Sequence, residues 1–142
     1  MMENIYYRII SFDLTRFEPS YDKFKENEPV AIESEFDFAF NTESNIIRCS
    51  MNLHFLQEKN TVLKTQLLTF LEIKKESVET LTKDNKIVLP KETLTQFASF
   101  GYGAMRGIMY LKTINTPFQG IILPPTELHK VFSNTVEIPL NQ

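Results

Sequence analysis

The sequence has 142 residues, enough for one domain with one sizeable hydrophobic core. Its net charge is −3, and the lysines at 74–75 and 83–86 are too sparse to form the basic patch of a nucleic-acid-binding protein. The N-terminal residues MMENIYYRIISF lack a basic region followed by a long apolar run, so we expect no signal peptide. A single cysteine excludes an intrachain disulfide. Together these features favour a reducing cytoplasm.

The first half of the chain has the pattern of four long β-strands. Residues 5–17 are rich in isoleucine and aromatic side chains, which favours a strand. Residues 18–29 contain two prolines and many charges and are expected to form a solvated connection, with Tyr21 and Phe24 pinning it to the body. Residues 30–40 and 46–56 alternate between apolar and polar side chains, as in half-buried antiparallel strands. A fourth strand is predicted at about 61–74.

Four strands joined in order predict an antiparallel β-meander. Strands of about 10 to 13 residues span roughly 33 to 44 Å. A helix near residues 91–114 would be about 36 Å long, so it can lie along the sheet. A short helical turn is expected at 77–81 and a polar loop at 82–86. After the long helix we expect a link through Pro117, an extended segment at 121–123 and a short helix from an N-cap at Thr126 to about Phe132. No repeat or low-complexity tract divides the chain, so residues 1–142 are predicted to form one α+β domain.

The predicted long helix is apolar on two sides. One stripe has the spacing of a helix face that packs on a core: Leu94, Phe97, Ala98, Gly101, Met105, Ile108 and Met109. A second stripe is also apolar or small: Phe100, Gly103, Ala104, Gly107, Leu111 and Ile114. Both sides must be covered, and the sheet covers only one, so a second copy of the chain is the natural candidate for the other.

Three residues of the second stripe are candidates for that interface: Gly103, Gly107 and Leu111. Gly103 and Gly107 lie one turn apart, a spacing that lets another helix approach closely. Simple tolerance of glycine beside a bulky neighbour is the alternative, and both interpretations stay open. The helix is not expected to insert into a membrane, because Arg106 interrupts a run shorter than about 18 apolar residues. Its glycines also miss the spacing of a dinucleotide-binding loop.

A search for catalytic or metal-binding residues finds no set that would work together. Cys49 lies on the apolar side of its strand, where a structural cysteine is the better interpretation. His54 and His129 have no cysteine or carboxylate at metal-ligand spacing. We therefore predict no enzyme activity, no cofactor and no metal.

Two other features of the sequence are relevant to a binding function. Glu33, Glu35 and Asp37 form a row on one face of a strand, which is either a solvated sheet face or an acidic docking patch for a basic protein partner. The chain also has more aromatic residues than one small core needs. Some are expected at interfaces or along a groove, although the core is the default position for any single ring.

The order of elements resembles the SecB-like family, named for the bacterial export chaperone SecB. Arg106 in GAMRGIM takes the place of that family's helix arginine, and Leu123-Pro124-Pro125 matches its L-x-P segment. Leu128 and Phe132 stand where its short helix has apolar anchors. Thr116 departs from the pattern, since a glycine usually ends the long helix. The sequence also lacks the strongly acidic net charge of the export chaperones and a clear counterpart of their partner-binding tail. The resemblance therefore supports the fold more strongly than it supports a role in export.

The resemblance implies a chaperone that assembles as a dimer or a dimer of dimers. Such a protein holds unfolded or extended polypeptides in long apolar grooves without nucleotide, by side-chain contacts and possible strand addition. The candidates for client contact are aromatic residues flanking the long helix: Phe100, Tyr102, Tyr110 and Phe118. The alternative is an oligomeric adaptor on the same fold that binds one specific protein partner, because fold does not fix function.

Overall fold

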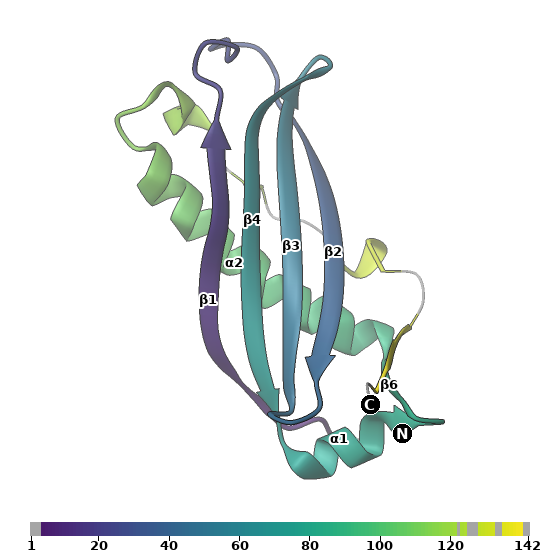
Figure 1. Ribbon diagram of the computed structural model, residues 1–142. Helices are drawn as coiled ribbons and strands as arrows, with labels where there is room; N and C mark the ends of the chain where they lie inside the picture. Colours follow the sequence, from purple (N-terminus) through teal and green to yellow (C-terminus); the bar gives the residue numbers. More distant parts are fainter. Residues whose placement is uncertain (1–3, 122, 125–127, 133–134, 141–142) are drawn as a thin grey trace.

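The computed structural model describes residues 4–121, 123–124, 128–132 and 135–140. It has two layers: an antiparallel sheet of four long strands, and a long helix, α2 (Lys91–Thr113), that crosses one face of the sheet (Figure 1). The four strands are β1 (Tyr7–Pro19), β2 (Ala31–Asn41), β3 (Ile46–Gln57) and β4 (Asn60–Ile73). The predicted strands and long helix are therefore present, with bounds that differ by at most two residues. In the described part of the chain, no helix is long and apolar enough to span a bilayer.

The strand order corrects the expectation of a simple meander. The order is β1-β4-β3-β2, so β2, β3 and β4 follow one another, but β1 lies beside β4. The β2–β3 and β3–β4 turns are tight, and each contains a residue in the left-handed region, Asn45 (φ 58°) and Glu58 (φ 57°). The connection between β1 and β2, residues 20–30, is too long for such a turn. It instead carries the chain from one edge of the sheet to the other.

A second, small sheet was not foreseen from the sequence. It has the order β5-β6-β7 and contains β5 (Thr82–Lys83), β6 (Lys86–Leu89) and β7 (Val136–Pro139). The predicted polar loop at 82–86 is in part a hairpin, since Asp84 and Asn85 both have positive φ, as a two-residue hairpin turn requires. A short helix, α1 (Lys75–Leu81), precedes it.

The segment after α2 contains two 3₁₀ turns, η1 (Pro117–Gly120) and η2 (Leu128–Lys130). The predicted short C-terminal helix is thus a single 3₁₀ turn in the described residues. The proposed N-cap, Thr126, and the middle of the predicted extended segment, residue 122, lie outside the described residues.

The core lies between the sheet and α2 and forms two adjoining clusters. The alternation predicted for β3 is confirmed: the buried series is Ile47, Cys49, Met51, Leu53 and Phe55, each at most 2% exposed. One cluster surrounds Phe97, and the other contains Phe55 and Phe118. Fully burying a side chain of this size contributes about 1.5–3 kcal/mol, so these positions fix the placement of α2 on the sheet.

Candidate functional site

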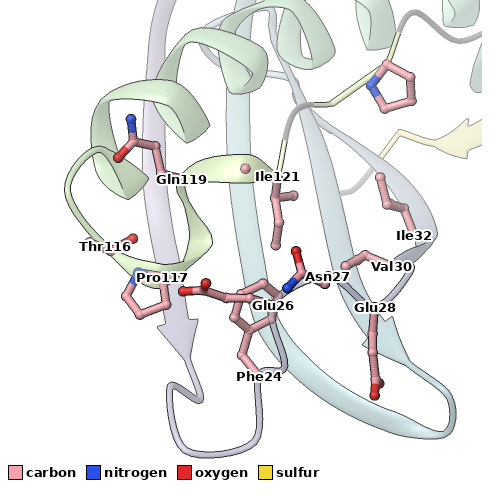
Figure 2. Close-up of a pocket in the computed structure, with 12 residues that line it drawn as sticks. Phe24, Glu26, Asn27, Glu28, Val30, Ile32, Thr116, Pro117, Gln119 and Ile121 are labelled. Carbon is pink, nitrogen blue, oxygen red and sulfur yellow. The ribbon is translucent and has the colours of Figure 1, made fainter.

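An open cavity of about 680 Å³ lies where the β1–β2 crossover meets the segment after α2 (Figure 2). Its volume is within the range of about 300–1,000 Å³ typical of ligand pockets. Apolar surface comes from Phe24 and Val30 in the crossover, from Ile32 at the start of β2, and from Ile121 after α2. The cavity is thus built from two segments that are far apart in the sequence: the crossover with the first residues of β2, and the segment after α2.

The crossover wall is held by aromatic packing, as predicted for Tyr21 and Phe24. The Phe24 ring stacks on Phe118 with 4.3 Å between ring centroids, and Tyr21 meets the same ring edge-on at 5.3 Å. The amide of Ser20 donates to the carbonyl of Val62 at 2.8 Å, which ties the start of the crossover to β4. Phe118 is 1% exposed, so it anchors the wall from below.

The opposite wall begins where α2 ends. Asn115 has φ 64°, and this left-handed residue turns the chain out of the helix, the role that a glycine usually has. The Thr116 hydroxyl then accepts from the Phe118 amide at 3.2 Å and donates to the Thr113 carbonyl at 2.6 Å. Asn115 and Thr116 together therefore make the turn for which a glycine is usual at position 116 in the SecB-like family.

Two polar side chains of α2 hold the following segment against the helix. The Tyr102 hydroxyl donates to the Pro124 carbonyl at 2.6 Å, and Arg106 Nε donates to the Leu123 carbonyl at 3.1 Å. Burial raises the pKa of Tyr102, with a smaller opposing effect from Arg106, so its hydroxyl remains a donor at neutral pH. The hydrogen bond to a backbone carbonyl gives Arg106 a structural contact.

The ionisable side chains at the cavity are acidic. Among the described residues that line it, the ionisable groups are Glu26 and Glu28, with no histidine, cysteine, lysine or arginine. Cys49 lies elsewhere, in the core, where burial and then the Asp37 carboxylate raise its pKa to about 12. Across the described residues, no three histidine, cysteine or acidic side chains come close enough to hold a metal ion.

The four aromatic residues named as client contacts are not brought together. Phe118 is buried, so its expected direct contact with a client is corrected to a supporting role beneath Phe24. Phe100 is half-buried and packs on Tyr7 of β1, with 5.9 Å between ring centroids. Tyr102 faces the segment after α2, as described above. Tyr110 is 62% exposed but does not line the cavity, so its contact with a client stays a prediction.

The glycine stripe of α2 is open. A Cβ at Gly103 or Gly107 would have no heavy atom within 4 Å, whereas a Cβ at Gly101 would lie 2.8 Å from Thr69 Oγ1. Leu111 on the same stripe is 72% exposed. On the edge strand β1, Phe12 is 41% exposed and pairs with Thr69, so it lies on the helix-facing side of the sheet.

The acidic row is on the outer face of β2. Glu33 and Glu35 are exposed, whereas the Asp37 carboxylate is 3.7 Å from the Arg48 guanidinium. Glu33 pairs in register with His54 of β3. Arg48 and His54 of β3 thus lie beside the row, and its use as a docking patch for a basic partner stays a prediction.

No known protein family and no curated protein matches the sequence. Among solved structures, the chain is similar to a SecB-like chaperone from Mycobacterium tuberculosis, solved in complex with a peptide from the HigA1 antitoxin. The similarity has a TM-score of 0.52 at 15% identity and covers 84% of this chain and 90% of that chain. The chain has a SecB-like fold. Another similar structure is a protein of unknown function from Streptococcus agalactiae, with a TM-score of 0.47, 13% identity, and coverage of 86% and 99%.

The SecB-like fold accounts for the residues that carried the resemblance. Leu123, Leu128 and Phe132 are all buried, and Phe132 packs against Phe36 and Phe38 of β2. The sequence interpretation missed that the β1–β2 crossover forms half of the cavity. The available signal was the pair Tyr21 and Phe24 within an otherwise charged segment.

Proposed function

We propose that this protein is a nucleotide-independent chaperone that holds extended segments of unfolded polypeptides in the cavity between the crossover and the segment after α2. The observation that carries the proposal is the cavity itself, where apolar side chains of the crossover, of β2 and of residue 121 lie beside polar and acidic ones. Across the described residues, no cluster of side chains could hold a metal ion. The peptide bound to the similar chaperone of M. tuberculosis supports this choice of ligand.

The neighbouring strand edge suits an extended ligand. β2 pairs with β3 on one side only and is therefore an edge of the four-stranded sheet. Ile32, at the start of this edge, lines the cavity, as does Val30 just before the strand. A client segment in the cavity can add to unpaired backbone groups of the edge while its side chains occupy the apolar walls. Backbone pairing is independent of side-chain identity, as a chaperone for many clients requires.

Self-association belongs to the same proposal. The open stripe on α2 and the exposed apolar residues of β1 form a surface that a second copy would cover, giving a dimer or a dimer of dimers. The outer acidic face would receive a basic partner, and the protein would act in the cytoplasm.

A second candidate is an adaptor that binds one specific protein. It is favoured by the origin of the neighbour's peptide, a single antitoxin. An aggregation assay with several unrelated proteins, each diluted from denaturant, distinguishes the two functions. A general chaperone suppresses aggregation of most of them, whereas an adaptor protects at most one.

A pair of variants connects the assay to the cavity. Ile121→Asp places a charge on the apolar wall and should reduce protection, while Val131→Asp, at a residue that is 45% exposed and outside the cavity, should not. Melting temperatures of both variants show whether the fold is kept. Equal protection by the two variants would remove the cavity from the proposal.

A further inference from the structure

Gln57 departs from the pattern of its own strand. The core-facing positions of β3 alternate through Ile47, Cys49, Met51, Leu53 and Phe55, all apolar and buried. Gln57 is the next residue in this series and is also buried, at 4% exposure. Burying an amide costs free energy unless it is hydrogen-bonded, so packing alone would favour an apolar residue at this position.

The buried amide makes its hydrogen bonds to the β1–β2 crossover. Gln57 Oε1 accepts from the Lys25 amide at 2.8 Å, and Gln57 Nε2 donates to the Lys25 carbonyl at 2.7 Å. Nε2 also lies 3.4 Å from the Glu28 carbonyl, a longer contact. The side chain thus pairs with the N–H and C=O of a single residue, as a neighbouring strand would.

These contacts bracket the part of the crossover that forms the cavity. Glu26, Asn27 and Glu28 line the cavity and directly follow Lys25. Asn27 has φ 71°, so the backbone turns sharply between the two contacted carbonyls. The Phe24 ring, stacked on Phe118, holds the crossover on the other side of Lys25. Gln57 is therefore a polar attachment of the cavity-forming part of the crossover, in addition to the aromatic packing of Phe24 and the Ser20–Val62 hydrogen bond at its start.

We propose that Gln57 is a positioning residue for client binding: its amide fixes the crossover wall at the place where it can contact an extended segment. The inference rests on the proposed function. Without the amide, the crossover samples other positions, and the apparent affinity falls in proportion to the population that keeps the wall in place. The ligand contacts themselves are unchanged.

The test replaces Gln57 with methionine, which has a similar volume and no amide. Amide hydrogen exchange should show lost protection at Lys25 while the β3 and β4 amides stay protected. The probe for binding is a fluorescein-labelled peptide of phenylalanines separated by serine and threonine. Its Kd should rise about tenfold, equivalent to about 1.4 kcal/mol. Gln57→Glu is a second variant, because its carboxylate faces the Lys25 and Glu28 carbonyls and should weaken binding at least as much.

Gln66→Met is the matched control. Gln66 of β4 also makes side-chain hydrogen bonds, to Thr15 at 2.6 Å and to Asn52 at 3.0 Å, but away from the cavity. It should leave both the peptide Kd and Lys25 protection unchanged. Unchanged peptide affinity in both Gln57 variants, or full protection of Lys25 in Gln57→Met, overturns the proposal. A wild-type protein that binds no peptide overturns the proposed function instead, and hydrogen exchange alone then decides whether Gln57 holds the wall.

Discussion

Replacing Gly107 with leucine separates the stability of one chain from its assembly with a second. In a single copy, a Cβ at this position has no heavy atom within 4 Å, so the new side chain projects into open space. Glycine in a helix interior is less favourable than a good helix former by about 0.8–1.0 kcal/mol. The fold of the isolated chain should therefore become more stable by up to about 1 kcal/mol.

The same substitution should weaken association through α2. Extra methylenes in a well-packed contact cost about 1–3 kcal/mol. At about 1.4 kcal/mol per tenfold, the dissociation constant should rise roughly 5- to 150-fold. Gly107→Ala adds a single methyl group and should raise the melting temperature with a smaller effect on assembly. Lys112→Leu adds an apolar side chain outside the stripe and should leave assembly unchanged.

Sedimentation velocity over a concentration series gives the mass of each variant, and thermal unfolding gives its stability. A wild-type protein that is monomeric at micromolar concentration would refute the proposed interface. The same conclusion follows if Gly107→Leu keeps the wild-type mass while its melting temperature rises, because the face is then open in solution.

Three further predictions concern residues whose environment is defined. Phe118→Ala should lower the free energy of unfolding by about 3–5 kcal/mol, measured by denaturant titration, because the ring is buried beneath Phe24. Arg106→Met should lower the free energy of unfolding by about 1 kcal/mol, because its hydrogen bond to the Leu123 carbonyl is lost. If this variant lost client binding while its mass and melting temperature stayed unchanged, the role of Arg106 would not be structural. Cys49, with its pKa raised from 9.0 to about 12, should react with an alkylating reagent at pH 8 only after unfolding. The thiol of Cys49 ionises at lower pH in the unfolded chain than in the folded one, so its contribution to the free energy of unfolding should decline as the pH rises from 9 towards 12. Rapid alkylation of the folded protein would contradict the burial of this thiol.

The strands and the long helix could be predicted because their side chains repeat with clear periods. The β3 series from Ile47 to Phe55 has period two and is buried as a row. The order of the strands could not be predicted in the same way. Periodicity indicates which face of a strand is buried but not its neighbour, and the 20–30 connection is long enough to reach either edge of the sheet.

The candidate site was predicted less well, for a physical reason. Apart from Val30 and Ile32, its walls come from segments without a regular hydrophobic period, where contacts are set by the tertiary fold rather than by sequence spacing. Nothing in the sequence around Phe118 indicates that its ring is buried, because it packs against Tyr21 and Phe24 of a loop that is distant in the sequence. Gln57 directly follows the predicted strand 46–56 and has the sequence pattern of a polar turn, although in the structure it continues the buried face of β3.

The central claim is that an extended polypeptide binds between the crossover and the segment after α2. Amide hydrogen exchange of the protein with and without a bound unfolded client tests it most directly. The account predicts slower exchange in residues 24–32 and 116–121 when the client is bound, with little change in β3 and β4. Slower exchange confined to other surfaces, or an unchanged pattern with the client bound, would contradict it.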